Sequence, residues 1–315
     1  MIIDGHCDTL SVGFDNKKQI SDSELQFSIK KVTEPTIQMM AAFISPEKYV
    51  QTGTQKAWNR TKDIINYFYE QKELFKSDII QILNEKDIEK VEKLNKIGVI
   101  LTIENGSSIC GDLSRIKELY DMGIRVMSIT WNMDNDLGCG AQTTDDTGLT
   151  ELGKQYIKEL IKNNIIIDIS HASKKTFWDV AELCNGTNAK VVATHSCVNA
   201  LCEHKRNLDD NQIKQIAKMN GVIGVCYYTE FLKNNGKVTI NDIINNISYI
   251  SNLVGIEYVA LGSDFDGIDK QNLPLDFNGV EDVYKIKEKM KSKGFSASNI
   301  QKVMADNWRR VLTSK

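Results

Sequence analysis

The chain has 315 residues, of which 41% are hydrophobic, so it can bury the core of two domains or of one large α/β barrel. Its 39 basic and 42 acidic residues nearly balance to a net charge of -3, which argues against nucleic acid as a partner. No apolar run approaches the ~18 residues of a membrane span, and no basic leader precedes the first apolar run. We therefore expect a soluble, cytoplasmic protein without a membrane partner.

The chain shows no internal boundary. It contains 3 prolines and no Gly/Ser-rich linker or charge block, which predicts a single domain over residues 1–315. The 7 cysteines lack C-x-x-C spacing, as expected of a reducing compartment rather than a disulfide framework.

Eight short runs rich in Ile, Val and Met recur along the chain, and runs of this kind are typical of strands buried on both faces. In chain order they are 2–4, 39–44, 97–103, 125–130, 165–169, 190–194, 222–226 and 258–262. Longer stretches between them, such as 156–161 and 240–250, place apolar residues three and four apart, which predicts helices. Gly98, Gly123 and Gly221 stand between such stretches and the next strand, where we expect helix C-caps.

Eight strands that alternate with helices predict a (β/α)8 barrel of the TIM type. A doubly wound sheet is the alternative, but the chain has no G-x-G-x-x-G or P-loop after its first strand. In a barrel, the chemistry is expected where strands end, because the loops at the carboxyl face build the site.

The first predicted strand runs into a polar cluster. Side chains alternate along a strand, so His6 and Asp8 face the same centre if the extended conformation continues, and Cys7 points away. Such a pair is suited to binding a metal, although a polar turn explains the stretch equally well.

Three further polar residues stand at the ends of other strands. Glu104 follows 97–103, His171 follows 165–169, and His195 follows 190–194. Each alone could be a loop residue or a histidine satisfied within the fold. However, three of only 4 histidines stand at strand ends, so a barrel would bring all the candidates towards one axis. The candidate metal ligands are His6, Asp8, Glu104, His171 and His195.

Five nitrogen and oxygen donors suit zinc, or else manganese, cobalt or iron. They exceed the three protein ligands of one catalytic zinc, which favours a two-metal centre with a bridging carboxylate. After the last strand, Asp264 could accept a proton from a metal-activated water, and we assign Asp266 to the turn before Gly267.

Two residues beyond the sixth strand also need an interpretation. His204 has charged neighbours and is expected in a solvated loop rather than as a ligand. Arg206 could hold a substrate carboxylate through its forked guanidinium, but an ordinary surface arginine explains its spacing more simply.

The polar motifs and their order resemble the membrane dipeptidase (renal dipeptidase) family of zinc peptidases. The matching stretches are 4–8, 103–106, 168–171, 194–196, 204–208, 262–267 and 306–311, which span nearly the whole chain. The resemblance implies a dinuclear zinc barrel of the amidohydrolase type. In that family His6 and Asp8 would bind one metal ion, His171 and His195 the other, and Glu104 would bridge them.

The same resemblance assigns roles around the metals. Asp264 corresponds to the proton-transfer acid, Arg206 to the group that receives the substrate's C-terminal carboxylate, and Tyr228 to an aromatic residue of the substrate pocket. The implied activity is hydrolysis of L,L and L,D dipeptides by a bridging hydroxide held between two zinc ions. One position departs: mammalian relatives have a histidine that contacts the scissile carbonyl, and this chain has Trp131 followed by Asn132.

Two other functions remain open. A related amidohydrolase that acts on a cyclic amide, a lactone or an amino-substituted base would keep the metals but have less use for Arg206. A non-catalytic metal- or peptide-binding protein is disfavoured by the complete ligand set. We expect a dipeptide substrate, and a homodimer is left open.

Overall fold

Eight parallel strands close into a barrel in the computed structural model, which describes residues 1–50 and 53–314. The ring runs β1, β2, β4, β5, β6, β7, β8 and β9, and β9 pairs with β1 to close it. These strands are β1 (Ile2–Cys7), β2 (Thr36–Phe43), β4 (Ile97–Glu104), β5 (Ile124–Ser128), β6 (Ile166–Asp168), β7 (Val191–Ser196), β8 (Ile223–Val225) and β9 (Val259–Leu261). Each overlaps one of the eight predicted strands, so the predicted (β/α)8 barrel is confirmed.

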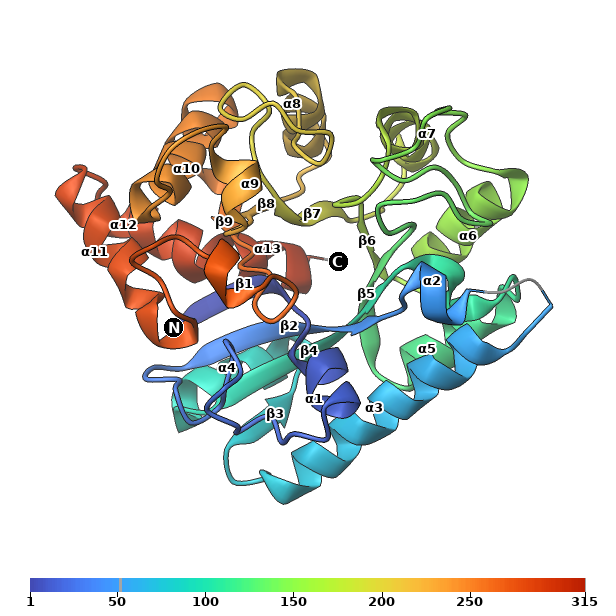
Figure 1. Cartoon of the computed structure of the whole chain (residues 1–315), viewed down its shortest axis with the longest axis horizontal. Helices are drawn as coiled ribbons and strands as arrows, with labels where there is room; N and C mark the ends of the chain where they lie inside the picture. The colour runs from blue at the N-terminus through green and yellow to red at the C-terminus, as the bar shows by residue number, and fades with distance from the viewer. Residues whose placement is uncertain (51–52, 315) are drawn as a thin grey trace.

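Helices surround the strands on the outside of the barrel (Figure 1). The α-helices are α1 (Thr9–Asp15), α2 (Pro46–Tyr49), α3 (Lys56–Leu74), α4 (Glu85–Leu94), α5 (Ser114–Asp121), α6 (Glu151–Lys162), α7 (Lys174–Cys184), α8 (Asp210–Lys218), α9 (Thr229–Leu232), α10 (Ile240–Val254), α11 (Tyr284–Ser292), α12 (Ala297–Gln301) and α13 (Asn307–Thr313). A π-helical turn, Lys302–Asp306, joins the last two. Among the described residues, no helix combines the length and apolarity needed to cross a membrane.

A ninth strand, β3 (Ile79–Gln81), lies outside the ring and was not predicted from the sequence. It pairs with the start of β4, where Ile79 is opposite Ile97, whereas β5 pairs with β4 only from Leu101 onwards. The barrel therefore still consists of eight strands. β3 is an additional strand that pairs only with the first residues of β4.

Two of the three predicted glycine C-caps are wrong. Gly123 has φ +92°, as expected of a cap, but Asn95 ends α4 with φ +52° and Asn220 takes the left-handed position after α8. Asparagine tolerates this conformation better than other residues with a Cβ. Gly98 lies inside β4, and a Cβ on Gly221 would come within 2.1 Å of the Val191 carbonyl oxygen, so close packing explains these two glycines.

The chain's last helix closes the end of the barrel opposite to the polar strand ends. Asn307 Nδ2 donates to the carbonyl oxygens of Ile256 and Val259 at 2.7 and 2.8 Å, and Trp308 Nε1 donates to Leu261 O at 2.8 Å. Trp308 is fully buried, and a Cβ on Gly5 would lie 2.5 Å from its ring. The helix thus packs against β9 and against β1, where Trp308 contacts Gly5, the residue before His6.

Candidate metal centre

The structure brings the five predicted metal ligands together at the carboxyl ends of the strands. His6 lies in β1, Glu104 is the last residue of β4, and His195 lies in β7. Asp8 follows β1 and precedes α1, and His171 follows β6 by three residues. All five are buried, with at most 7% of any residue exposed. Distant segments of the chain therefore share one polar centre at the carboxyl end of the barrel.

Glu104 lies at the middle of this centre. Its Oε2 is 3.5 Å from His6 Nε2, and its Oε1 is 2.8 Å from His171 Nε2. On one side, His6 Nε2 is 3.7 Å from Asp8 Oδ2. On the other, the Nε2 atoms of His171 and His195 are 2.8 Å apart. The carboxylate of Glu104 therefore contacts a His/Asp pair and a His/His pair at once.

The donor atoms fit metal ions. Within 4.8 Å of one another lie the ligand atoms of three groups: His6, Asp8 and Glu104; Glu104, His171 and His195; and His6, His195 and Asp264. Two buried atoms, His6 Nε2 and Asp8 Oδ1, have no hydrogen-bond partner among the described residues. Buried polar atoms without a partner are costly, and a cation bound among them would satisfy both.

The charges in the centre shift the pKa values of its members strongly. Burial, reinforced by the charge of Glu104, raises the pKa of Asp8 to about 6. Burial opposes ionisation of Glu104 too, but hydrogen bonds from His171 and His6 hold its pKa well below the usual range. Burial and the nearby Arg206 lower the pKa of His171 to about 4. His171 is therefore neutral at pH 7, as a metal ligand must be.

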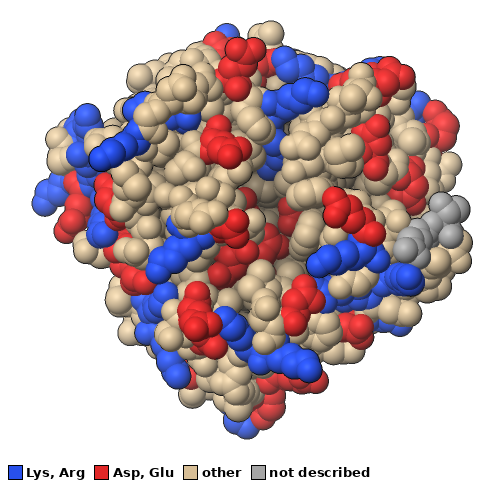
Figure 2. Space-filling view, in the orientation of Figure 1, with Lys and Arg blue, Asp and Glu red and all other residues tan. Residues whose placement is uncertain are grey.

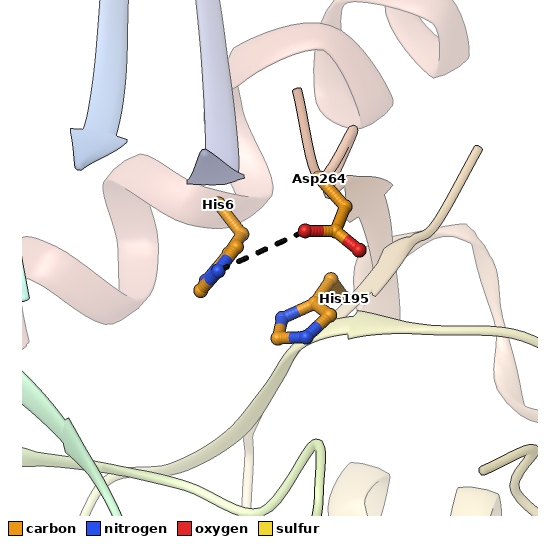
Figure 3. A group of neighbouring side chains, drawn as sticks. All are labelled: His6, His195 and Asp264. Atoms are coloured by element: carbon orange, nitrogen blue, oxygen red, sulfur yellow. Dashed lines mark ion pairs between the residues drawn. The ribbon is translucent and has the colours of Figure 1, made fainter. Parts of the chain in front are cut away.

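Asp264 faces the same centre from the loop after β9. Figure 3 shows its carboxylate directed towards His6, with Oδ1 3.9 Å from His6 Nε2, and with the His195 ring beside it. Its backbone has φ +63°, a conformation uncommon for residues other than glycine. Burial, aided by the charges of Asp8 and Glu104, raises the pKa of Asp264 to about 8. A carboxyl group with such a pKa can exchange a proton near neutral pH.

Arg206 is not the surface residue that its spacing suggested. Only 3% of it is exposed, and its Nη2 lies 3.3 Å from His171 Nε2 and 3.4 Å from His195 O. Its Nε and Nη1 have no hydrogen-bond partner among the described residues. The guanidinium also lies over the Phe231 ring, 5.4 Å from its centroid. A buried cation with two free donors beside the metal centre is suited to receive an anionic ligand.

A pocket of about 510 Å³ opens onto these groups. Figure 2 shows it as a hollow at the centre of this face, with acidic side chains at its floor. Tyr228 lines it and packs edge-on against Phe231, with ring centroids 4.7 Å apart. Trp131 lines it next to Phe43 at 5.5 Å. The pocket thus combines the metal centre and Arg206 with aromatic walls.

Asn132 has a different place from its neighbour Trp131. Its Oδ1 lies 2.9 Å from Nδ1 of His171, so its amide is engaged with a candidate metal ligand. From the sequence, the contact made by the histidine of the mammalian relatives is supplied by Asn132 or Trp131, or is absent. The Trp131 ring lines the pocket, 6.2 Å from the His171 ring, and no hydrogen bond between it and a candidate metal ligand is seen among the described residues.

The expectations for His204 and Asp266 need refinement. His204 belongs to none of the metal-binding groups found among the described residues, as expected. Nevertheless, it is half-buried, lines the pocket and packs against Phe231 with ring centroids 4.6 Å apart and planes tilted by 42°, so it is not simply a solvated loop residue. Asp266 turns the chain with φ +64°, as predicted, and its carboxylate also accepts hydrogen bonds from Thr9 and from the backbone of Gln26 and Phe27.

Sequence reasoning missed two neighbours of the site. Cys226 Sγ lies 3.8 Å from Asp264 Oδ2, close enough for a weak hydrogen bond. A Cβ on Gly267 would lie 2.3 Å from Asp264 Oδ1 and 2.4 Å from Asp8 Oδ2, so only glycine fits there. Cys226 stands at a predicted strand end, which was the available signal. Gly267 was noted only as a turn residue.

A parallel barrel whose strand ends collect histidines and carboxylates around a pocket is the architecture of metal-dependent barrel hydrolases. The chain belongs to the membrane dipeptidase family, peptidase family M19, because the family model matches residues 1–315. It is therefore a metallopeptidase-type hydrolase of the dipeptidase family.

Two curated relatives are similar in sequence. A protein of Klebsiella pneumoniae, "Uncharacterized protein in pqqA 5'region", is 32% identical over 240 residues, which are 73% of this chain and 86% of that protein. The "Uncharacterized dipeptidase C965.12" of Schizosaccharomyces pombe is 33% identical over 196 residues, which are 60% of this chain and 45% of that protein. This chain thus matches less than half of the yeast protein.

A solved structure supports the fold. The metallo peptidase of Rhodobacter sphaeroides, liganded with a phosphinate mimic of the dipeptide L-Ala-D-Ala, superposes with a TM-score of 0.89. The match covers 99% of this chain and 98% of that one at 21% identity. At this identity, the likeness establishes the shared barrel.

Proposed function

We propose that the protein is a zinc-dependent dipeptidase that hydrolyses free dipeptides with two metal ions per chain. His6 and Asp8 would hold one ion, His171 and His195 the other, and Glu104 would bridge them. The arrangement of Glu104 between the two pairs supports this assignment. Two such ions would polarise the scissile carbonyl and supply hydroxide at neutral pH. Zinc as the ion, and a bridging position for the hydroxide, remain predictions.

The observation that carries the proposal is the free, buried guanidinium of Arg206. Its unpartnered Nε and Nη1 can form two charge-assisted hydrogen bonds with the C-terminal carboxylate of a substrate. This carboxylate would then lie close to the metal centre, since Arg206 Nη2 is 3.3 Å from His171 Nε2. An anchor at that distance favours short peptides, because a longer C-terminal segment would have no place beyond it.

Asp264 would transfer the proton that the reaction moves. Its carboxylate faces His6 and His195 and has few hydrogen-bond partners of its own, so it is free to accept a proton and to pass it to the leaving amine. Tyr228 would contribute an aromatic wall of the substrate pocket.

The range of substrates includes L,D as well as L,L dipeptides in this proposal. The family resemblance implies both, and the Rhodobacter sphaeroides relative was solved with a mimic of L-Ala-D-Ala. A cytoplasmic location, a single catalytic domain over 1–315 and a homodimer also remain predictions.

The proposal is tested by hydrolysis of L-Ala-L-Ala and L-Ala-D-Ala on zinc-loaded protein, each compared with its C-terminal amide. The free acids should be cleaved with a kcat/KM at least about 100-fold higher, because a charge-assisted pair of this kind is worth about 3 kcal/mol. Equal rates for acid and amide would contradict the carboxylate anchor. Failure to cleave any dipeptide would instead favour a cyclic amide, a lactone or an amino-substituted base as the substrate.

A matched variant separates the anchor from the rest of the site. Arg206→Met keeps the length and apolar stem of the side chain but removes its donors. Its kcat/KM should fall to the parent's value for the amide, and the amide itself should be cleaved about as fast as by the parent. An equal loss for both substrates would mean that Arg206 supports the structure rather than the substrate.

A further inference from the structure

Asp168, the last residue of β6, is a buried carboxylate outside the metal-binding groups found among the described residues. Its Oδ1 accepts hydrogen bonds from Ser170 N at 3.0 Å, Ser170 Oγ at 2.6 Å and Thr194 N at 3.0 Å. Its Oδ2 accepts a fourth from Thr194 Oγ1 at 2.6 Å. Since Thr194 lies in β7, Asp168 joins the ends of two neighbouring strands.

These contacts determine where the hydroxyl protons lie. The carboxylate of Asp168 accepts from backbone N–H groups on Oδ1, and Thr194 Oγ1 donates its single proton to Oδ2. The lone pairs of Thr194 Oγ1 then face Nδ1 of His195 at 2.8 Å and the Ser170 hydroxyl at 3.1 Å, whose own proton is donated to Asp168. Nδ1 therefore carries the ring proton and donates it. Ser170 follows the same logic, because its hydroxyl donates to Asp168 and accepts from the His195 backbone N–H at 3.1 Å.

The position of that proton decides what His195 can bind. A neutral imidazole with its proton on Nδ1 has a free lone pair on Nε2. In His195 this atom lies 2.8 Å from His171 Nε2. His171 Nε2 in turn lies 2.8 Å from Glu104 Oε1, and its Nδ1 lies 2.9 Å from Asn132 Oδ1. The lone pair on Nε2 of His195 therefore faces the centre, where it can bind a metal ion, whereas an N–H at this position could not.

We propose that Asp168 and Thr194 are positioning residues that fix His195 in the Nδ1–H tautomer and thereby keep its Nε2 available to a metal ion. The inference rests on the proposed function only in taking His195 as a metal ligand. Partners of this kind behind a metal-binding histidine contribute 10- to 100-fold to metal affinity in other proteins. Here the partner is a threonine, which in turn is oriented by a carboxylate.

The first test reads the tautomer directly by ring ¹⁵N NMR of metal-free protein at pH 7.5. The chain has only 4 histidines, so each signal can be assigned by substitution. The parent should show His195 protonated on Nδ1. In Asp168→Asn, the amide oxygen should take the place of Oδ1, which accepts from the backbone N–H groups of Ser170 and Thr194. The amide nitrogen should then take the place of Oδ2. It would donate to Thr194, whose hydroxyl would then donate to Nδ1 and shift the ring proton to Nε2.

Two NMR results would overturn the inference. One is a parent His195 that already carries its proton on Nε2, and the other is a tautomer that Asp168→Asn leaves unchanged. The spectra of His6 and His204 serve as internal references, because neither ring is bonded to Thr194 in the structure.

The second test measures zinc affinity by competition with a chromophoric chelator. Thr194→Val removes the hydroxyl at nearly constant shape and should weaken binding 10- to 100-fold. Thr194→Ser restores the hydroxyl and should bind within about threefold of the parent. Thr102→Val is the matched control, since Thr102 in β4 is equally buried and its hydroxyl has no partner among the described residues. It should bind zinc as the parent does.

Parent-like affinity in Thr194→Val, or an equal loss in Thr194→Ser, would contradict the positioning role. If Thr194→Val does not fold, as circular dichroism would reveal, the tautomer in Asp168→Asn decides. Neither test uses a substrate, so the outcome is separable from that of the proposed function. A parent that binds two zinc ions but cleaves no dipeptide would refute the dipeptidase alone.

Discussion

Asp264 and Asp266 illustrate how two residues of the same type, both in the left-handed conformation, acquire different roles from their neighbours. The carboxylate of Asp266 accepts hydrogen bonds from Thr9 Oγ1 at 2.6 Å and from the backbone N–H of Gln26 at 2.7 Å. Among the described residues, the Asp264 carboxylate has one hydrogen-bond partner, the Cys226 thiol, besides a 3.9 Å ion pair with His6, and it lies near other carboxylates. The carboxylate of Asp266 therefore stabilises a loop, whereas the buried and weakly bonded carboxylate of Asp264 is expected to cost stability.

Asp264→Asn should abolish dipeptide hydrolysis and yet stabilise the metal-free protein at neutral pH. Burial and the neighbouring carboxylates raise the pKa of Asp264 to about 8, so the folded state holds a proton that the unfolded state releases above about pH 4. The free energy of unfolding of the parent should therefore fall as pH rises from 4 to 8. In the variant, position 264 cannot ionise, so this contribution to the fall is absent. We expect the Tm of the metal-free variant to exceed the parent's by roughly 5 °C at pH 8, and by little at pH 4.

Asp266→Asn is the control for this prediction. Asparagine also tolerates φ +64°, but its amide nitrogen would face a donor, either Thr9 and Phe27 or Gln26. This variant should be less stable than the parent by about 1–3 kcal/mol at pH 8. If both variants shift Tm in the same direction, the loss of stability at high pH does not come from ionisation of Asp264.

The sequence predicted where the two aspartates lie, because both follow an apolar strand and precede a glycine: Asp266 forms the turn and Asp264 faces the centre, while proton transfer by Asp264 stays a prediction. It could not predict that Cys226 or Asn132 contacts the site. Those contacts depend on the loops of other strands, and a single residue type such as asparagine carries no signal of which histidine it will meet. The burial of Arg206 was missed for the same reason, and only the family motif indicated its role.

At the scale of elements, the final helix α13 shows how a segment far from the chemistry supports the site. Trp308 fills the space beneath Gly5 and donates to Leu261 O in β9. The sequence placed α13 within a family motif but offered no mechanical reason for it. Similarly, β3 has the apolar residues of a strand but is too short to stand out, since only Ile79–Gln81 pairs with the barrel.

Trp308→Ala should lower the free energy of unfolding by about 3–5 kcal/mol, the usual cost of removing a fully buried tryptophan. Because the cavity would lie directly below β1, zinc affinity should fall as well. Urea unfolding and zinc titration measure the two effects. Trp178→Ala provides the comparison, since Trp178 is 42% exposed and its loss should cost less than about 1 kcal/mol. Equal costs would mean that α13 does not support the barrel.

At the scale of the whole molecule, the candidate site is assembled from β1, β4, β7 and the segment after β6. This assembly was predictable, because a parallel barrel directs all its strand ends to one face, and most of the chain's histidines stand there. The exact distances were not, since they depend on barrel closure through the pairing of β1 with β9. The hydrophobic clusters of the core contain none of the proposed metal ligands, so we expect the fold to form without a metal ion.

Metal removal should therefore affect the site far more than the fold. After exhaustive chelation, dipeptide hydrolysis should disappear and Tm should fall by roughly 5–10 °C, because each ion held well above its Kd contributes about 4 kcal/mol. Far-UV circular dichroism at 25 °C should stay unchanged, since the strands and helices pack through apolar residues. Adding zinc should restore both activity and Tm.

Two variants define the source of this shift. His171→Ala removes a proposed ligand, so chelation should lower its Tm much less than the parent's. His204→Ala removes a histidine that lies by the pocket but belongs to none of the metal-binding groups among the described residues, and it should keep the full shift. An unchanged parent Tm after verified metal loss, or a full shift in His171→Ala, would mean that ions do not bind where the strand ends converge.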